Sequence, residues 1–154
     1  MTHEWLESDS IITYKTMHKE ERVFAQSRTA RTMYWDDGSK LYCTVHAGDR
    51  SIDKEKLADE LRIELHRARE YPMHQAPGRL SPLLCKEDIG LVACLLWDKR
   101  IMPGTLLDFP HPSDDYRRVV TSPAVISYWL RELGGIPVTR GDISKDLRDE
   151  RASR

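Results

Sequence analysis

The sequence predicts a compact single domain of the α+β class, in which a central mixed β-sheet or partial barrel is flanked by helices. Short segments rich in β-branched and aromatic residues alternate with amphipathic segments. These segments do not follow the regular strand-helix order of a doubly wound sheet. The chain of 154 residues is long enough to bury one hydrophobic core.

Three strands open the predicted fold, and a tight turn joins the second to the third. Residues 11–16 and 30–36 are rich in β-forming residues, and Asp37-Gly38 is a typical hairpin turn leading into LYCTVHA at 41–47. Between the first two strands, the polar segment 18–28 predicts a short helix.

The next elements are a helix and a buried strand. The sequence DKEKLADELRIEL has leucines at 57, 61 and 65, a spacing that predicts an amphipathic helix beginning near Ile52. The apolar run GLVACLLW at 90–97 predicts a fully buried strand.

The last predicted elements are a surface loop, a strand, a helix and a closing strand, followed by a charged tail. DFPHPSDDY at 108–116 predicts a surface loop, and YRRVVTS at 116–122 a strand. A helix should begin after Pro123 and end at Gly134-Gly135, with a closing strand at 136–139. We expect one domain over 1–154, with its core at about 11–141 and a charged tail at about 142–154 that frays at its end.

Composition narrows the classes of function. The chain has 24 Lys and Arg residues against 25 Asp and Glu residues, so any polyanion must meet a local basic patch. No apolar run approaches the roughly 18 residues of a membrane helix, and we expect no membrane association and no DNA binding. Cys43, Cys85 and Cys94 are widely spaced, which favours reduced thiols and a cytoplasmic protein.

The order of several segments resembles a known family. ARTMYWDDGSKLYCTVHAGDRSIDKEKLADEL (30–61) is followed by APGRLSPLL (76–84) and LVACLLWDKRI (91–101). Together they resemble the YbaK / aminoacyl-tRNA-editing-associated domain, the fold of the insertion domain of bacterial prolyl-tRNA synthetases. The resemblance covers about residues 25–140, and it depends on shared order and spacing, since each motif alone is common.

The resemblance implies hydrolysis of the ester in a mischarged aminoacyl-tRNA, with the 3′ end of the tRNA as partner. The family uses neither a cofactor nor a covalent protein nucleophile. A glycine loop approaches the substrate carbonyl closely because glycine has no Cβ, and its N–H groups orient that carbonyl.

The resemblance also implies which residues form the pocket. Arg31, Gly78 and Ser81 are the expected catalytic residues. The expected substrate-binding residues are Thr32, Tyr34, His46, Gly48, Arg79, Pro82, Asp98 and Ser122. Tyr34 and Trp35 alternate across a strand, so one should face the core and the other could stack on a terminal adenine. Arginines and lysines near the loop form the candidate phosphate patch: Arg67, Arg69, Arg79, Lys99 and Arg100.

The chain departs from the family pattern in three respects. Only HRAREYPMHQ separates the leucine helix from the glycine loop, where the family has a longer stretch with a short helix. Arg31 stands where the family has a lysine, and the two side chains are not equivalent at a tight site. The segment 120–125 has no glycine where the family has a second glycine loop, and Ser122 and Pro123 could replace it. The alternative function is therefore an inactive module that binds aminoacyl-tRNA, a nucleotide-like ligand or a protein partner.

Two other chemistries are disfavoured by the residue pattern. The six histidines include no His-x-x-x-His pair on a helix, so we expect no metal site. Cys43 and Cys94 lie within apolar strands and are expected to be core residues rather than nucleophiles.

Overall fold

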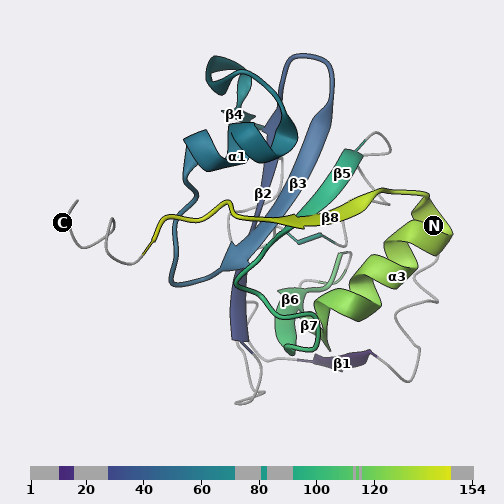
Figure 1. The fold of residues 1–154 in the computed structure, drawn as a ribbon. Helices are drawn as coiled ribbons and strands as arrows, with labels where there is room; N and C mark the ends of the chain where they lie inside the picture. The colour runs from purple at the N-terminus through teal and green to yellow at the C-terminus, as the bar shows by residue number, and fades with distance from the viewer. Residues whose placement is uncertain are drawn as a thin grey trace.

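The fold is a mixed β-sheet with two α-helices and one short 3₁₀ helix (Figure 1). The computed structural model describes residues 11–15, 28–71, 81–82, 92–112, 114 and 116–146. Their strands are β1 (Ile12–Lys15), β2 (Arg28–Asp36), β3 (Leu41–Ala47), β4 (Arg69–Glu70), β5 (Val92–Asp98), β6 (Leu107–Pro110), β7 (Arg117–Thr121) and β8 (Val138–Gly141). Their helices are α1 (Lys54–Leu61), η2 (Leu65–Arg67) and α3 (Pro123–Gly134). The predicted fold class is confirmed.

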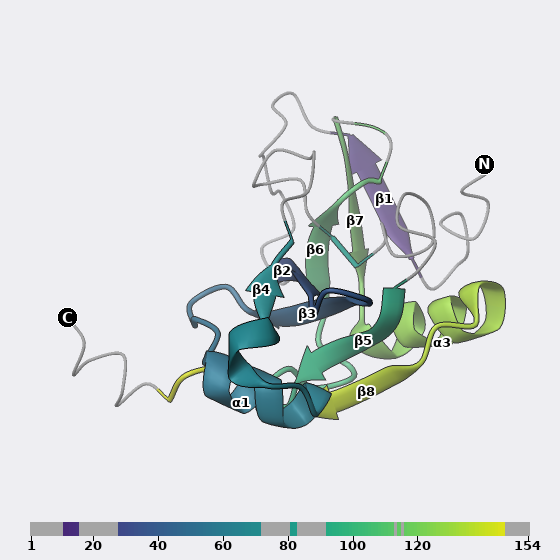
Figure 2. The same ribbon diagram turned by 90° about the horizontal axis from the view of Figure 1, so that it is seen from above.

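The long strand β2 connects the two halves of the sheet. The strand order is β1-β7-β6-β2-β3-β5-β8, and β4 also pairs with β2. Residues 28–29 of β2 pair with β6, whereas residues 30–36 pair with β3 in the predicted hairpin. β3, β5 and β8 run parallel to one another. Figure 2 shows β1, β6 and β7 on one side of β2 and β3, β5 and β8 on the other.

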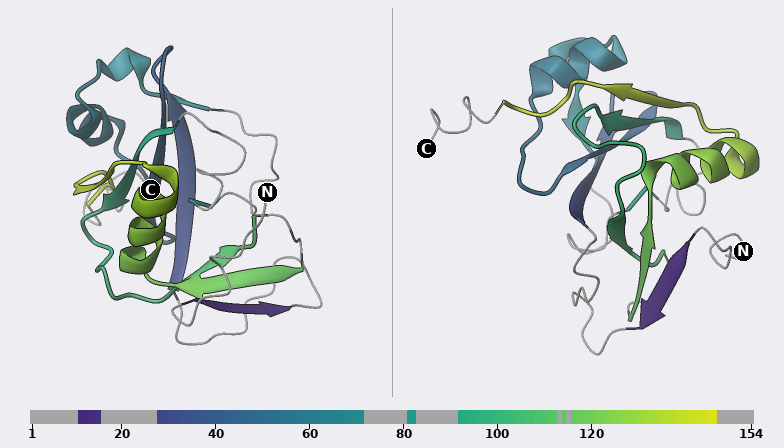
Figure 3. Two further views of the ribbon diagram at one scale, coloured as in Figure 1. Left: turned by 90° about the vertical axis from the view of Figure 1, so that its right-hand side faces the viewer. Right: turned by 60° about the horizontal axis from the view of Figure 1, so that its bottom comes forward.

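The alternation of side chains along β2 separates two hydrophobic clusters. Tyr34 belongs to the larger cluster, which also contains Trp97 from β5 and Ile126 from α3. Trp35 belongs to a smaller cluster together with Leu57 from α1. Figure 3 shows α1 beside the β2–β3 hairpin and α3 continuing from the end of β7.

The predicted helix near Ile52 is shorter than expected. α1 begins after Asp53, whose carboxylate accepts hydrogen bonds from the N–H groups of Glu55 and Lys56. It ends because Arg62 adopts a left-handed conformation and returns its N–H to the last turn. Leu65 therefore lies in η2, where it is 48% exposed instead of continuing the apolar face.

The surface loop predicted at 108–116 is wrong at its beginning. Asp108, Phe109 and Pro110 belong to the buried strand β6. Asp108 tolerates burial because Arg118 Nε donates to its carboxylate at 2.5 Å and the Tyr14 hydroxyl donates to its other oxygen.

The other expected elements match with small shifts. α3 has Ser122 as its N-cap and ends at Gly135, whose φ of 61° suits glycine. β7 lies within 116–122, while β8 is displaced by two residues from the expected 136–139. The helix expected at 18–28 lies outside the described residues, apart from its last position, which is in β2.

The first part of the expected tail is packed against the domain. Residues 142–146 run beside residues 51–53, with the Asp53 N–H donating to the Ile143 carbonyl at 2.8 Å. The Lys145 N–H likewise donates to the Ser51 carbonyl at 2.9 Å, and Ile143 and Ser144 are fully buried. The core thus extends beyond residue 141, and residues 147–154 lie outside the described residues.

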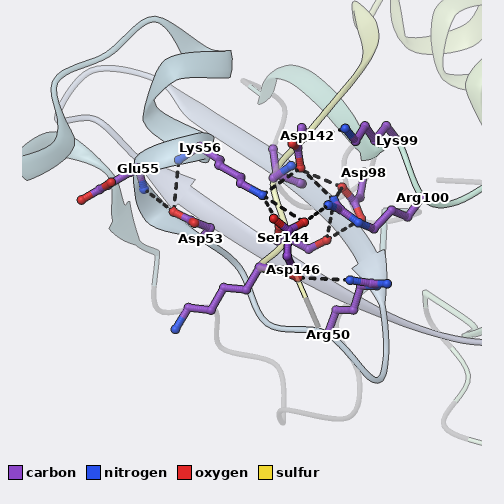
Figure 4. Close-up of polar contacts among 12 residues, drawn as sticks. Arg50, Asp53, Glu55, Lys56, Asp98, Lys99, Arg100, Asp142, Ser144 and Asp146 are labelled. Atoms are coloured by element: carbon purple, nitrogen blue, oxygen red, sulfur yellow. Dashed lines mark hydrogen bonds and ion pairs between the residues drawn. The ribbon is translucent and has the colours of Figure 1, made fainter. Parts of the chain in front are cut away.

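A charged cluster at the end of β5 holds this segment, and we call it the Asp98 clasp (Figure 4). The buried Asp98 carboxylate accepts hydrogen bonds from the Ser144 hydroxyl at 2.7 Å and the Ile143 N–H at 3.3 Å. Arg100 lies 3.4 Å from Asp98 and donates to Asp142 at 2.8 Å and Asp146 at 2.7 Å. Arg100 is therefore engaged in the fold, and the expectation that it serves a phosphate patch is wrong.

We expect Arg100→Ala to lower the free energy of unfolding by roughly 1.5–3 kcal/mol, the range for hydrogen bonds to charged groups. The substitution removes the cation from the buried Asp98 and from two further carboxylates. Urea unfolding followed by circular dichroism measures the loss. Lys99→Ala is the matched control, because the mostly exposed ion pair of Lys99 with Asp142 should contribute under about 1 kcal/mol. Equal losses in the two variants would contradict the clasp.

The clasp should also make stability depend on acidic pH. The Arg100 hydrogen bond, assisted by Lys99, lowers the pKa of Asp142 from 3.8 to about 2 against the effect of partial burial. Because the pKa is lower in the folded state, this stabilisation is complete above about pH 4 and is lost as the pH falls toward about 2. Unfolding measured between those values should show a smaller pH dependence for Asp142→Asn than for the parent protein. Superimposable pH profiles would refute this assignment.

Candidate functional site

Over the middle of β2, one edge of the strand is not paired with any described strand. On this edge β6 pairs with Arg28 and Thr29, and β4 pairs with Trp35 and Asp36. Between these pairings, no strand of the described residues lies against the edge, while β3 pairs with the opposite edge from Ala30 to Asp36. Among the described residues the uncovered stretch is centred on residue 32, and we call it the opening; an extended ligand could form strand-like hydrogen bonds there.

Thr32 presents its backbone to this opening. The Tyr34 carbonyl accepts a hydrogen bond from the Tyr71 N–H at 2.7 Å on the same edge. Both backbone groups of a strand residue point to one edge, and residues two apart share that edge. The N–H and C=O of Thr32 thus face the opening.

The side chain of Thr32 is buried without a hydrogen-bond partner. It is 6% exposed, and its Oγ1 has no partner among the residues that the structure describes. A buried polar group left unpaired costs about 1–3 kcal/mol. Such groups are rare in folded proteins, and this one lies beside the stretch of β2 that no described strand covers.

The predicted loop contacts β2 on the Thr32 face. Ser81 is fully buried and Pro82 is also buried, and the Ser81 carbonyl accepts a hydrogen bond from the Tyr34 hydroxyl at 2.6 Å. Because Thr32 and Tyr34 are two residues apart, they project to the same face of the strand. Ser81 and Pro82 are therefore held on the face that carries the unpaired Thr32 hydroxyl. Gly78 and Arg79 lie outside the described residues.

Three other expected site residues lie on neighbouring strands. Arg31 is paired with His46 across β2 and β3, and Asp98 follows Trp97, the β5 residue that pairs with Val45. Arg31 projects to the face opposite Thr32 because the two residues are adjacent on the strand. Arg31 is exposed and makes no ion pair with any described residue, whereas His46 is 1% exposed. The described members of the expected set are thus divided between two faces, and among them Arg31, the direct neighbour of Thr32, combines exposure with proximity to the opening.

Neither aromatic residue of β2 offers a ring for base stacking. Tyr34 is 0% exposed and Trp35 is 1% exposed, because each face of the strand is covered by its own hydrophobic cluster. The expectation that one of them stacks on a terminal adenine is therefore wrong. The Tyr34 hydroxyl instead positions the loop through Ser81.

The remaining expected residues have structural roles. Gly48 donates its N–H to the Thr29 carbonyl, and a Cβ there would come within 3.0 Å of the Thr29 methyl group. Ser122 accepts a hydrogen bond from the Val125 N–H and caps α3. Asp98 belongs to the clasp, consistent with a structural acid.

Sequence reasoning missed the opening itself and the role of Tyr71. β4 has only two residues, so it has no periodicity by which to recognise it.

No group of three or more metal-binding side chains occurs within the described ranges. None of the helices described here is long and apolar enough to cross a membrane.

Comparison with known proteins connects the fold, but not the sequence, to earlier structures. No protein-family model and no curated protein matches the chain. A crystal structure provisionally assigned as a trans-editing enzyme for prolyl-tRNA synthetase matches with a TM-score of 0.59 and 10% identity, covering 88% of this chain and 87% of that one.

Two further solved structures are similar to a comparable degree. A designed scaffold for the presentation of linear epitopes matches with a TM-score of 0.60, 12% identity and coverage of 88% and 87% of the two chains. The hypothetical protein APE2540 matches with a TM-score of 0.56, 14% identity and coverage of 92% and 97%. At such identities the likeness establishes the fold, which is compatible with the YbaK-like architecture.

Proposed function

We propose that the protein is a trans-editing aminoacyl-tRNA deacylase, which hydrolyses the ester of a mischarged aminoacyl-tRNA at the opening beside Thr32. The observation that carries the proposal is the buried hydroxyl of Thr32, which has no partner in the described part of the chain and lies beside a stretch of edge that no described strand covers. The fold shared with a provisionally assigned trans-editing enzyme supports the same reaction.

The groups at the opening suit an ester substrate. The Thr32 N–H and hydroxyl are donors for a carbonyl oxygen, and donors held in place by a sheet need no reorganisation when negative charge develops. An aminoacyl ester is already reactive, so a water or the vicinal ribose hydroxyl can attack once the carbonyl is oriented. This chemistry requires no covalent nucleophile and no cofactor from the protein.

Arg31 and the loop complete the proposed site. Arg31 is exposed next to Thr32 and has no described ion pair, so its guanidinium is available for the terminal phosphate or the acyl carbonyl. Ser81 and Pro82 form the wall on the Thr32 face, anchored by Tyr34. The resemblance implies that Gly78, three residues before Ser81 in the sequence, supplies a close backbone approach to the substrate.

The second candidate is a module that binds aminoacyl-tRNA without cleaving it. Arg31 favours this alternative, because a planar guanidinium in place of a compact ammonium can hold a phosphate without serving the same role at the ester. Retention of aminoacyl-tRNA with no release of amino acid would identify this function.

Labelled aminoacyl-tRNAs incubated with the purified protein test the proposal. At least one member of the panel should lose its amino acid faster than in buffer alone. Gly78→Ala should slow that reaction roughly 10²-fold, the effect of one lost donor, because the added methyl group would hold the substrate carbonyl away from the backbone N–H. Gly104→Ala is the matched control, because a Cβ at Gly104 would meet nothing within 4 Å. Arg31→Ala should also slow it, and Arg31→Lys shows whether a compact cation suffices. If no substrate is deacylated, the enzymatic proposal fails.

Thr32→Val should separate function from stability. Valine keeps the shape of threonine and removes a hydroxyl that has no described partner, so the free energy of unfolding should stay the same or rise. Deacylation should fall about tenfold or more, the loss expected for a missing hydrogen bond to a developing charge. Thr32→Ser, which keeps the hydroxyl, should retain most of the activity. A Thr32→Val protein that is fully active would remove the hydroxyl from the site.

A further inference from the structure

A hollow lies at the end of β2, at the turn of the β2–β3 hairpin. It has a volume of about 460 Å³. The hairpin turn and the η2–β4 segment are separated in the sequence but lie close together at this end of the molecule (Figure 1). The lining residues are Asp36, Asp37, Gly38, Ser39, His66, Arg67 and Arg69.

The acidic groups of this hollow are occupied by the turn itself. Asp37 accepts hydrogen bonds from the N–H groups of Ser39 and Lys40 through one oxygen and from the Tyr42 hydroxyl through the other. These bonds, led by that of Tyr42, hold the pKa of Asp37 well below its usual range. Asp36 accepts from the Gly38 N–H at 2.7 Å. The carboxylates of Asp36 and Asp37 thus accept hydrogen bonds from groups of the hairpin itself.

The basic groups, in contrast, have unused donors. Arg67 and Arg69 are exposed and make no hydrogen bond or ion pair through their side chains with any described residue. Their main chain is nevertheless fixed: Ala68 between them is 3% exposed, and Arg69 is paired with Asp36 across β4 and β2. His66 adds a third nitrogen group, 3.3 Å from Glu64.

From this arrangement we propose that the hollow is a phosphate-binding site, with Arg67 and Arg69 as its ligands. Two arginines presented from one short segment match the oxygens of a phosphate, which accepts paired hydrogen bonds from guanidinium groups. The carboxylates of the hollow hold the hairpin turn, since Asp37 accepts hydrogen bonds through both oxygens and Asp36 accepts one through Oδ1.

The position of the site suggests where the phosphate comes from. Thr32 and Asp36 are four residues apart on β2, which is about 13 Å in an extended strand. The opening and β4 also share one edge of β2. A nucleic-acid strand whose 3′ end enters the opening could therefore place a backbone phosphate at Arg67 and Arg69. Only this RNA source depends on the proposed deacylase function, because a free phosphate or a nucleotide would use the same two side chains.

Two probes distinguish the sources. Pyrophosphate is titrated into the full-length protein while the amide resonances of residues 36–39 and 66–69 are followed by NMR. Unacylated tRNA is titrated at several salt concentrations. Arg67→Ala and Arg69→Ala are compared with Lys15→Ala, which removes the same charge from the exposed end of β1.

The site predicts a specific pattern in these titrations. Each arginine variant should bind pyrophosphate roughly tenfold more weakly. If RNA is the source, each should also reduce the slope of log affinity against log salt by about 0.7–0.9. Lys15→Ala should leave pyrophosphate binding unchanged.

Loss of pyrophosphate binding with an unaltered tRNA slope would support the site with a small-molecule phosphate. If Arg67→Ala and Arg69→Ala behave like Lys15→Ala with both probes, the phosphate site is overturned. A protein that binds pyrophosphate in this way but deacylates nothing would retain the site and lose the deacylase function.

Discussion

The backbone pairing of β2 is the constraint on which the rest of the structure depends. This strand pairs with β3 along one edge and with β6 and β4 at the two ends of the other edge. Its alternation directs Tyr34 into the larger hydrophobic cluster and Trp35 into the smaller one. A shift of one residue would exchange the two faces, so burial on both faces determines the register.

The same strand explains why a site can exist inside a well-packed sheet. Where β6 and β4 leave β2 uncovered, Thr32 has backbone groups facing an opening and a buried hydroxyl without a described partner. The pairing on either side is sufficient to hold this residue in place, and the Tyr34 hydroxyl holds the Ser81 carbonyl next to it. Rigid strands thereby position groups whose hydrogen-bonding capacity the fold leaves unused.

Cations that look alike in the sequence have different roles in the structure. Arg100 is surrounded by the carboxylates of Asp98, Asp142 and Asp146, and it holds the segment after β8 against the domain. Arg67 and Arg69 have no such partners and face a hollow whose acids are already hydrogen-bonded. Both the Asp98 clasp and the hollow contain acidic and basic side chains. In the hollow, however, the guanidinium groups of Arg67 and Arg69 have no partner among the described residues and are available to a ligand.

The sequence by itself determined the class of fold and most of its local elements. The Asp37-Gly38 turn, the apolar run of β5 and the glycine that ends α3 each depend on interactions between near neighbours, and each was predictable for that reason. Only the tertiary structure decided that Asp108 lies in a buried strand, because its charge is compensated by Arg118 and Tyr14 from other strands. It also decided that Asp98 stabilises the fold and that both Tyr34 and Trp35 are covered. The opening at Thr32 arises from where β4 and β6 stop, and such an end of pairing between distant segments leaves no periodic signal along the chain.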